Sequence, residues 1–250
     1  MKTVAVSNQK GGTGKTCIGL HLAMFLAEAG HSVLFVDIDP QANASKTLAP
    51  HSSQEVSSSL FAAEPIEVKK AGGITLISAD AKMADMERAN PQVVGHFRKN
   101  INSLSGAFDF CVIDTPPSLG LRMTSALVAA DYVLSPIELE EYSIDGIKMM
   151  LQTIFGVKQK YNPKLEFLGM LPNRFNSRSE RQKATFSELV KNYSELLVPA
   201  KIGFRSSIPE ALASGVPVWS LKKTAAKEAG REFKAAFKIV FDRVGGVSDE

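Results

Sequence analysis

A glycine-rich stretch near the start of the chain restricts the fold more than any other feature of the sequence. It reads NQKGGTGKT over residues 8–16, follows an apolar run at residues 3–8, and leads into apolar residues at helical spacing. Glycines let the backbone turn sharply and point several N–H groups at one centre, because no Cβ atom obstructs them. A lysine, a threonine and a helix N-terminus come directly afterwards, and such a loop is suited to hold phosphate groups. The stretch therefore predicts a strand, a phosphate-binding loop and a helix in succession.

The loop departs from the common phosphate-loop pattern, G-x-x-x-x-G-K-[ST], at its first position. Counting back from Gly14 puts the first glycine at position 9, where the chain has Gln9 followed by Lys10. In the common pattern Lys15 would contact the β- and γ-phosphates and the Thr16 hydroxyl would bind Mg²⁺. A phosphate that is already held does not need a second lysine. Lys10 either serves the nucleotide of another subunit, where it would stabilise transition-state charge, or is an exposed lysine without a role.

Strand and helix patterns alternate along the chain, and the strands are continuous apolar runs. This combination is typical of the α/β class, in which helices cover both faces of a parallel sheet. Ligands of such sheets bind beyond the carboxyl ends of the strands. The predicted strands are residues 3–8, 32–39, 73–79, 108–115, 131–138, 165–173 and 195–202. The predicted helices are residues 16–30 (ended by Gly30), 91–104, 122–130, 143–161, 180–193, 208–215 and 225–244.

The composition is that of a globular protein, with 44% hydrophobic and 22% charged residues among 250. No apolar run reaches the roughly 18–20 residues of a membrane span, and the first residues do not form a signal peptide. We therefore expect a cytoplasmic protein with two reduced core cysteines, Cys17 and Cys111. The four histidines lack metal-ligand spacing. We expect one domain over residues 1–244, a disordered tail over 245–250 and a mobile Ser-rich loop over 49–60.

Polar residues end three of the predicted strands. Asp37 and Asp39 are two positions apart, so their side chains point to the same face, and Asp114 follows the apolar run FCVI. Asp39 is the better candidate to orient or activate a water molecule, and Asp114 fits an acid that holds Mg²⁺ through water. Asp37 either shares the site or is a structural acid such as a helix N-cap. The amide of Asn173 suits the edge of an adenine, with a turn former beside Pro172 as the alternative.

Several motifs together resemble the ParA/MinD family of deviant Walker A ATPases. KGGTGKT (residues 10–16) resembles the family signature K-G-G-x-G-K-[ST], VDIDPQANAS (36–45) the second motif, and FDFCVIDTPPSLG (108–120) the third. PNRF (172–175) and IPEALASGVPV (208–218) resemble later base-side and nucleic-acid-side segments. The second motif favours the ParA branch. The resemblance implies a three-layer P-loop NTPase with a mostly parallel twisted sheet and helices on both faces.

The resemblance also implies a slow ATPase that uses ATP and Mg²⁺ and forms an ATP-dependent homodimer around the nucleotides. Catalysis would depend on Lys10, which reaches across the dimer, together with Lys15 and Asp39. The residues that hold the metal would be Thr16, Asp39 and Asp114. The nucleotide-binding residues would be Lys10, Gly11, Gly12, Thr13, Gly14, Lys15, Thr16, Cys17, Asn173 and Pro209.

The carboxyl-terminal third of the chain is basic. Residues 174–243 contain fourteen Lys and Arg against seven Asp and Glu, a charge of +7, so the other residues sum to −4 within the total of +3. Such a segment is either a surface for a polyanion or a solvated helical face. The resemblance implies DNA binding without sequence preference, which should weaken with salt, although IPEALASGVPV departs from the common family form. The candidates for DNA contact are Arg178, Arg205, Lys222, Lys223, Lys227 and Arg231.

The last helix leaves a membrane as the alternative partner. Its apolar stripe could lie in a lipid interface, as in the MinD branch, or pack on the sheet, and we favour packing. The stripe comprises Phe233, Phe237, Val240, Phe241 and Val244. An ATP-dependent amide-forming synthetase of related fold is a further alternative, against which Lys10 argues.

The sequence thus predicts a ParA-type ATPase that positions or segregates a plasmid, a chromosome or a protein cluster. The resemblance implies a ParB-like or equivalent activator protein that stimulates hydrolysis, and a nucleoid-associated location.

Overall fold

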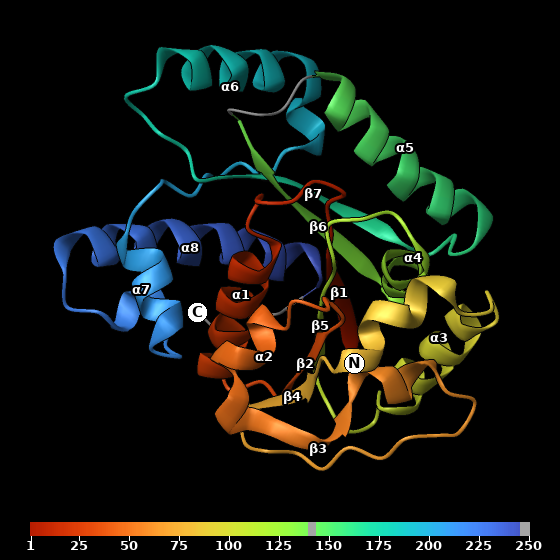
Figure 1. Cartoon of the computed structure of the whole chain (residues 1–250). Helices are drawn as coiled ribbons and strands as arrows, with labels where there is room; N and C mark the ends of the chain where they lie inside the picture. Colours follow the sequence, from red (N-terminus) through yellow and green to blue (C-terminus); the bar gives the residue numbers. More distant parts are fainter. Residues whose placement is uncertain (140–143, 246–250) are drawn as a thin grey trace.

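Seven parallel strands form one sheet in the order β3-β4-β2-β5-β1-β6-β7 (Figure 1). The computed structural model describes residues 1–139 and 144–245. Apart from its first residue, the predicted disordered tail lies outside the described residues. The strands are β1 (Lys2–Val6), β2 (Val33–Asp37), β3 (Ser52–Val56), β4 (Ile74–Ser78), β5 (Phe110–Asp114), β6 (Tyr132–Glu138) and β7 (Glu166–Asn173).

Helices cover both faces of this sheet, as the sequence predicted. Figure 1 shows α1, α7 and α8 on one side and α3, α4 and α5 on the other. The α-helices are α1 (Lys15–Glu28), α2 (Asn43–Thr47), α3 (Val93–Ser103), α4 (Leu121–Ala129), α5 (Ile144–Lys160), α6 (Glu180–Tyr193), α7 (Ser207–Ala213) and α8 (Thr224–Arg243). Short 3₁₀ helices are η1 (Ala49–His51), η2 (Ser57–Phe61), η3 (Ala81–Arg88), η4 (Ser194–Leu196) and η5 (Val218–Ser220).

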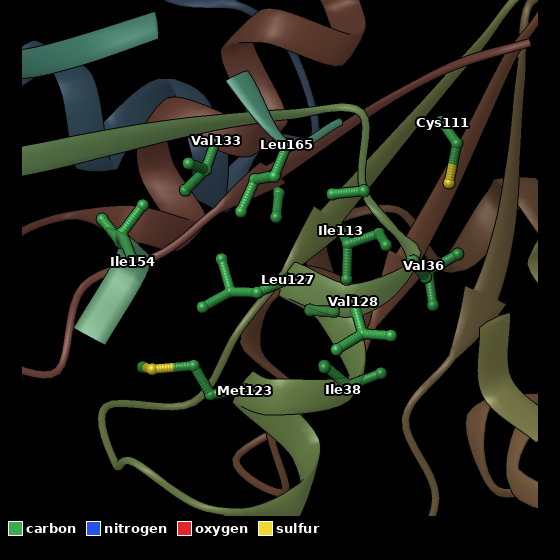
Figure 2. Close-up of a cluster of buried hydrophobic side chains, with 14 of the residues drawn as sticks. Val36, Ile38, Cys111, Ile113, Met123, Leu127, Val128, Val133, Ile154 and Leu165 are labelled. Carbon is green, nitrogen blue, oxygen red and sulfur yellow. The ribbon is translucent and has the colours of Figure 1, made fainter. Parts of the chain in front are cut away.

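Neighbouring residues of an inner strand belong to two separate hydrophobic cores, one on each face of the sheet. In β2, Leu34 and Val36 belong to the core beneath α3, α4 and α5, whereas Val33 and Phe35 belong to the core beneath α1 and α8. Figure 2 shows part of the first core, where Ile113 of β5 lies near side chains of α4. Since successive strand residues point to opposite faces, two covered faces require a continuous apolar run. The three-layer α/β prediction is therefore confirmed.

The first helix ends as its glycine indicates. Gly30 has φ 87°, in the left-handed region where a Cβ is unfavourable. Its N–H donates to the Ala27 carbonyl (3.0 Å), and the next N–H, of His31, donates to the Leu26 carbonyl (3.1 Å). This pair of bonds is the Schellman arrangement, which satisfies carbonyls at the end of a helix.

Two predictions of local structure are wrong. The Ser-rich segment 49–60 is not a loop throughout, because it forms η1, the edge strand β3 and most of η2. The side chains of Ser52 and Ser78 lie 3.2 Å apart at the β3–β4 pairing. Residues 195–202 do not form a strand; they continue from η4 and contact β7 through the bridge between Met170 and Leu197 and a hydrogen bond from the Ile202 N–H to the Pro172 carbonyl (2.8 Å). An edge strand of serines lacks the apolar signal that marks the inner strands.

The apolar stripe of α8 packs into the core. All five of its predicted members are between 0% and 8% exposed. The prediction that this stripe packs on the sheet is therefore confirmed, and these side chains are not available to a lipid interface. Among the described residues, no helix is long and apolar enough to cross a membrane.

The parallel strands end at one edge of the sheet and bring the polar residues together there. Asp37 of β2 is in register with Asp114 of β5, which is also paired with Val6 of β1. Glu138 of β6 is in register with Asn173 of β7. The glycine-rich loop leaves β1 at this same edge.

Candidate nucleotide-binding site

The glycine-rich loop connects β1 to the N-terminus of α1 in the conformation that its glycines permit. Gly12 and Gly14 have φ values of 80° and 86°. A Cβ at Gly14 would lie 2.2 Å from the Nδ2 atom of Asn173, so a side chain at this position would displace the amide. The backbone N–H groups of the first turn of α1 have no partner within the helix, which makes this end suitable for an anion.

The leading edge of the loop is tied to the sheet and to α5. The Asn8 side chain donates to the Pro136 carbonyl (2.7 Å) and accepts from the Lys10 N–H (3.0 Å). Gln9, which replaces the usual glycine, donates to the Thr153 hydroxyl of α5. Gln9 therefore anchors the loop to α5, and the side chain of the next residue, Lys10, is half-buried.

Lys15 is buried inside the loop among acidic groups. Its ammonium donates to the Lys10 carbonyl (2.9 Å). Burial lowers the pKa of Lys15, and the charges of Asp114 and Asp39 oppose that shift. A buried ammonium at the centre of a loop of N–H donors is placed to bind an anionic group such as a phosphate.

Asp114 is the clearest candidate in the site for binding a cation. Both of its carboxylate oxygens are buried and lack a hydrogen-bond partner among the described residues. Burial, and next the charge of Asp37, raise the pKa of Asp114 well above its usual range. The nearby Thr16 hydroxyl counters part of this rise, although its geometry falls short of a hydrogen bond. An unpartnered buried carboxylate is costly unless a cation compensates it.

These groups fit a Mg²⁺ ion with a nucleotide. Mg²⁺ prefers oxygen ligands and keeps several waters, so it is held by one or two protein groups together with phosphates. Asp114 and Thr16 supply such oxygens beside Lys15, and Asp39 is 9% exposed at the same edge. When bound, the ion would neutralise charge on the phosphates.

Asp37 and Asp39 have different surroundings. Asp37 accepts from the N–H of Ser45 (2.8 Å) and from its hydroxyl (2.7 Å), and so holds the first turn of α2 against the sheet. It also accepts from the Asp39 N–H (3.1 Å). These contacts support the interpretation of Asp37 as a structural acid. One oxygen of Asp39 accepts from the Gln41 N–H (2.9 Å), and Asp39 remains a candidate for orienting water.

A cavity of about 290 Å³ opens beside the loop. Four predicted nucleotide-binding residues line it, namely Gly14, Cys17, Asn173 and Pro209. The Nδ2 atom of Asn173 donates to the Thr13 carbonyl (2.9 Å), so its Oδ1 atom is left as an acceptor for a donor such as the adenine amino group. Burial raises the pKa of the Cys17 thiol to about 12, so this part of the wall is uncharged.

Three residues near this cavity were missed by the sequence analysis. Arg174 and Phe204 line the cavity, and Glu138 lies at the end of β6 with its Oε1 atom 3.4 Å from Arg174 Nε. Arg174 has φ 56° and Phe204 is 62% exposed. The motif PNRF contains Arg174, but a four-residue motif does not predict a left-handed backbone angle or a contact with Phe204.

Two of the six predicted DNA-contact side chains are paired with carboxylates. Arg205 makes two hydrogen bonds to Glu232 (2.6 and 2.8 Å), and Lys223 binds Glu210 (2.6 Å). Carboxylates of the same chain therefore neutralise these two cations, although the pair of Lys223 and Glu210 lies on the surface, 61% and 45% exposed. The other four candidates are exposed: Arg178, Lys222, Lys227 and Arg231. Binding of DNA by any of them stays a prediction.

Known proteins resemble this chain over most of its length. An AAA domain family matches residues 1–167. Protein IncC of Escherichia coli is 46% identical over 256 residues, which cover 98% of this chain and 70% of that protein. The chromosome partitioning protein ParA of Myxococcus xanthus (strain DK1622) is 33% identical over 215 residues, covering 80% of this chain and 76% of that protein.

A solved structure extends the comparison to bound cofactors. Cobyrinic acid a,c-diamide synthase from Mycobacterium smegmatis, with bound ATP analog and magnesium, superimposes with a TM-score of 0.73 at 28% identity. The match covers 89% of this chain and 97% of the synthase chain. From its motifs, its parallel sheet and these relatives, the chain belongs to the ParA branch of the ParA/MinD family of P-loop ATPases.

Proposed function

We propose that this chain hydrolyses ATP slowly with Mg²⁺ and uses an ATP-bound homodimer to position or segregate a cargo on DNA. The observation that carries the proposal is the buried Asp114 carboxylate, which lacks a hydrogen-bond partner beside Lys15. A nucleotide-bound Mg²⁺ would supply the cation that this carboxylate needs.

Each part of the site has a role in this reaction. The loop amides and Lys15 bind the phosphates, Thr16 and Asp114 hold Mg²⁺, and Asp39 orients the water that attacks the γ-phosphorus. The bond from that phosphorus to the β–γ bridging oxygen breaks, ADP leaves, and the proton lost by the water ends on the phosphate or in solvent. Lys10 of each protomer neutralises charge on the partner's nucleotide in the transition state.

The relatives support a partitioning role. IncC is the more similar of the two reported proteins, and the more distant one is named a chromosome partitioning protein. We infer a ParB-like or equivalent activator that stimulates hydrolysis and so releases the dimer. Binding to bulk DNA would place the protein on the nucleoid.

An Asp39→Ala variant tests this proposal, because it should bind ATP and dimerise without hydrolysing it. With ATP and Mg²⁺, we expect the variant to bind random-sequence DNA more persistently than the wild type, with binding lost at high salt. DNA retention and anionic liposome pelleting are measured separately. Asp85→Ala is the control, because Asp85 is an exposed residue of η3.

Other outcomes would contradict the proposal in distinct ways. Pelleting with liposomes but not with DNA would favour a MinD-like membrane role. Binding to neither would favour an ATP-dependent amide-forming synthetase, a reaction class that includes the structural relative described above.

A further inference from the structure

Three exposed cations follow one another at the start of α8. Lys227 and Arg231 are four residues apart, so their side chains are neighbours on one face of the helix. Lys223, the N-cap residue of α8, lies four residues before Lys227. A row of cations at this spacing is suited to the successive phosphates of a polyanion.

A carboxylate of α7 covers the first of these cations. Both oxygens of Glu210 accept from the Lys223 ammonium (2.6 and 2.7 Å). Because both side chains are largely exposed, such a pair contributes little to stability. A phosphate can therefore replace the carboxylate at small cost, and the main effect of Glu210 falls on what else Lys223 can bind.

The pair of Arg205 and Glu232 is built differently. Glu232 accepts two hydrogen bonds from the Arg205 guanidinium (2.6 and 2.8 Å) and a third from the Gly203 N–H (2.8 Å). The Arg205 side chain is only 20% exposed. These contacts anchor residues 203–205 to α8, so Arg205 stays with its carboxylate, whereas Lys223 can exchange its partner.

Helix α7 connects Glu210 to the cavity beside the phosphate loop. Ile208, Pro209 and Leu212 of α7 line that cavity, and α7 packs against α8 (Figure 1). A nucleotide in the cavity would therefore contact the helix that carries Glu210. A shift of about 1 Å would take the 2.6 Å contact to Lys223 beyond hydrogen-bonding distance.

The structure of α7 allows such a shift at its first turn. The helix has only seven residues, Ser207–Ala213. The Ser207 hydroxyl at its start is buried and lacks a hydrogen-bond partner among the described residues. A movement of this end therefore breaks no hydrogen bond of that side chain, and it can supply the hydroxyl with a partner.

We propose that Glu210 is a cover for Lys223 that responds to nucleotide. In the nucleotide-free chain, Glu210 occupies Lys223 and lowers the affinity for DNA. Nucleotide binding beside α7 separates the pair and frees the lysine for one more phosphate contact. This inference rests on the proposed function, since it takes the ligands to be ATP and DNA.

Glu210→Gln tests the cover, because it removes the charge and keeps the size of the side chain. The dissociation constant for random-sequence duplex DNA is measured at several salt concentrations, without nucleotide and with ATP and Mg²⁺. All proteins carry Asp39→Ala, so that ATP is not consumed. Without nucleotide, we expect Glu210→Gln to bind DNA about 3- to 5-fold more tightly, the range that an exposed ion pair allows.

The salt dependence and the ATP arm identify the cause of this gain. Without nucleotide, the slope of log Kd against log salt concentration should steepen by about 0.9, the value of one added phosphate contact. With ATP, where the pair is already separated, Glu210→Gln should change neither the slope nor the affinity by more than about 1.5-fold.

Two further variants serve as controls. Adding Lys223→Gln to Glu210→Gln should abolish the gain, because the freed cation is then absent. Glu180→Gln removes an exposed carboxylate that lies 2.7 Å from Lys183 of α6. It should leave the affinity for DNA unchanged with and without ATP.

Three outcomes would overturn the inference. No gain in the nucleotide-free state would show that Glu210 does not withhold a cation from DNA. An equal gain with and without ATP would show that Glu210 is only a nearby negative charge that nucleotide does not move. A gain that persists after Lys223→Gln would assign the effect to another cation. If no protein bound DNA in either state, the proposed function itself would fail.

Discussion

At the scale of single residues, the site buries one lysine and several carboxylates close together, and their charges do not compensate one another fully. Lys15 is buried and its pKa is lowered, yet it lies among acids, and burial of one of them, Asp114, raises the pKa of that carboxyl. Placing these groups in one low-dielectric region costs stability. A bound cation and a polyanion would compensate these buried charges. Functional sites commonly lower the stability of the unliganded fold in this way.

His21 is a second buried ionisable residue, and it predicts how stability depends on pH. Its Nε2 atom accepts from the Val218 N–H (3.2 Å), so Nδ1 carries the proton and donates to the Cys17 carbonyl (2.8 Å). The ring stacks on Phe233 with the centres 4.3 Å apart. Burial lowers the pKa of His21 to about 4.

The unfolded chain, with an ordinary histidine pKa of about 6.5, binds more protons than the folded chain between pH 6.5 and 4. The stability contribution of neutral His21 is therefore complete above about pH 6.5 and is lost as the pH falls. From pH 7 to pH 4, we expect a loss of about 3 kcal/mol in the free energy of unfolding that a His21→Gln variant lacks. Denaturant titrations at both pH values measure it. His51→Gln is the control and should keep the full loss, and an unchanged loss in His21→Gln would contradict this account.

Much of the site could be predicted residue by residue, and the exceptions share a cause. Gly14, Lys15 and Thr16 follow from a short local pattern, because a loop between a strand and a helix fixes their positions. Asp114 follows from its place at the end of an apolar strand. Arg174 does not, since its place in the cavity wall depends on a left-handed backbone angle and on Phe204, thirty positions away.

At the scale of elements, one carboxylate joins the outer 3₁₀ helix η3 to the start of α4. Glu87 accepts from the Leu121 N–H (2.7 Å) and from Arg122 Nε (2.7 Å). A Cβ at Gly120 would lie 1.9 Å from a Glu87 oxygen, so the glycine leaves room for this contact. A negative charge at the N-terminus of α4 also suits the helix dipole. Since α4 follows the segment after Asp114, Glu87 helps to fix the far end of that segment.

Replacing Glu87 by Ala should therefore lower the free energy of unfolding by more than the loss of an exposed ion pair would. The Arg122 side chain is only 8% exposed and would lose its ion partner, so we expect a loss of about 2 kcal/mol in the free energy of unfolding. Glu180→Ala is the matched control, because the Glu180–Lys183 pair has the same 2.7 Å separation but lies in solvent. Its loss should stay below about 0.5 kcal/mol. Equal losses in the two variants would mean that burial of Arg122 does not matter.

The elements that the sequence predicted well are the ones buried on both faces. Continuous apolar runs identify β1, β2, β4, β5, β6 and β7, because covering both faces demands apolar residues at every position. The sequence did not predict strand β3, because four of its five side chains are polar and all five are exposed or half-buried. Residues 195–202 have an apolar run for another reason, since Leu197, Val198 and Ile202 fill the core without pairing as a strand.

At the scale of the whole molecule, the sheet topology brings together residues from distant parts of the sequence. One edge of the sheet brings together the loop after β1, Asp114 at the end of β5, Asn173 at the end of β7 and the segment before α7. Local patterns identified the first two, and the family resemblance indicated Asn173 and Pro209, whereas the rest of the cavity wall formed by residues 203–212 depends on tertiary packing. The described chain presents Gly11 and Gly12 as exposed residues at this edge. A second protomer could therefore approach the nucleotide closely.

Lys10 provides the test of that arrangement, because its backbone and its side chain have separate tasks. Its N–H binds Asn8 and its carbonyl accepts from Lys15, and both contacts survive in Lys10→Ala. We therefore expect the variant to bind ATP but to lose ATP-dependent dimerisation, measured by sedimentation, and to lose at least about 100-fold in activator-stimulated hydrolysis. Lys46→Ala, which removes an exposed lysine of α2, should dimerise normally. Normal dimerisation and turnover in Lys10→Ala would mean that each protomer completes its own site.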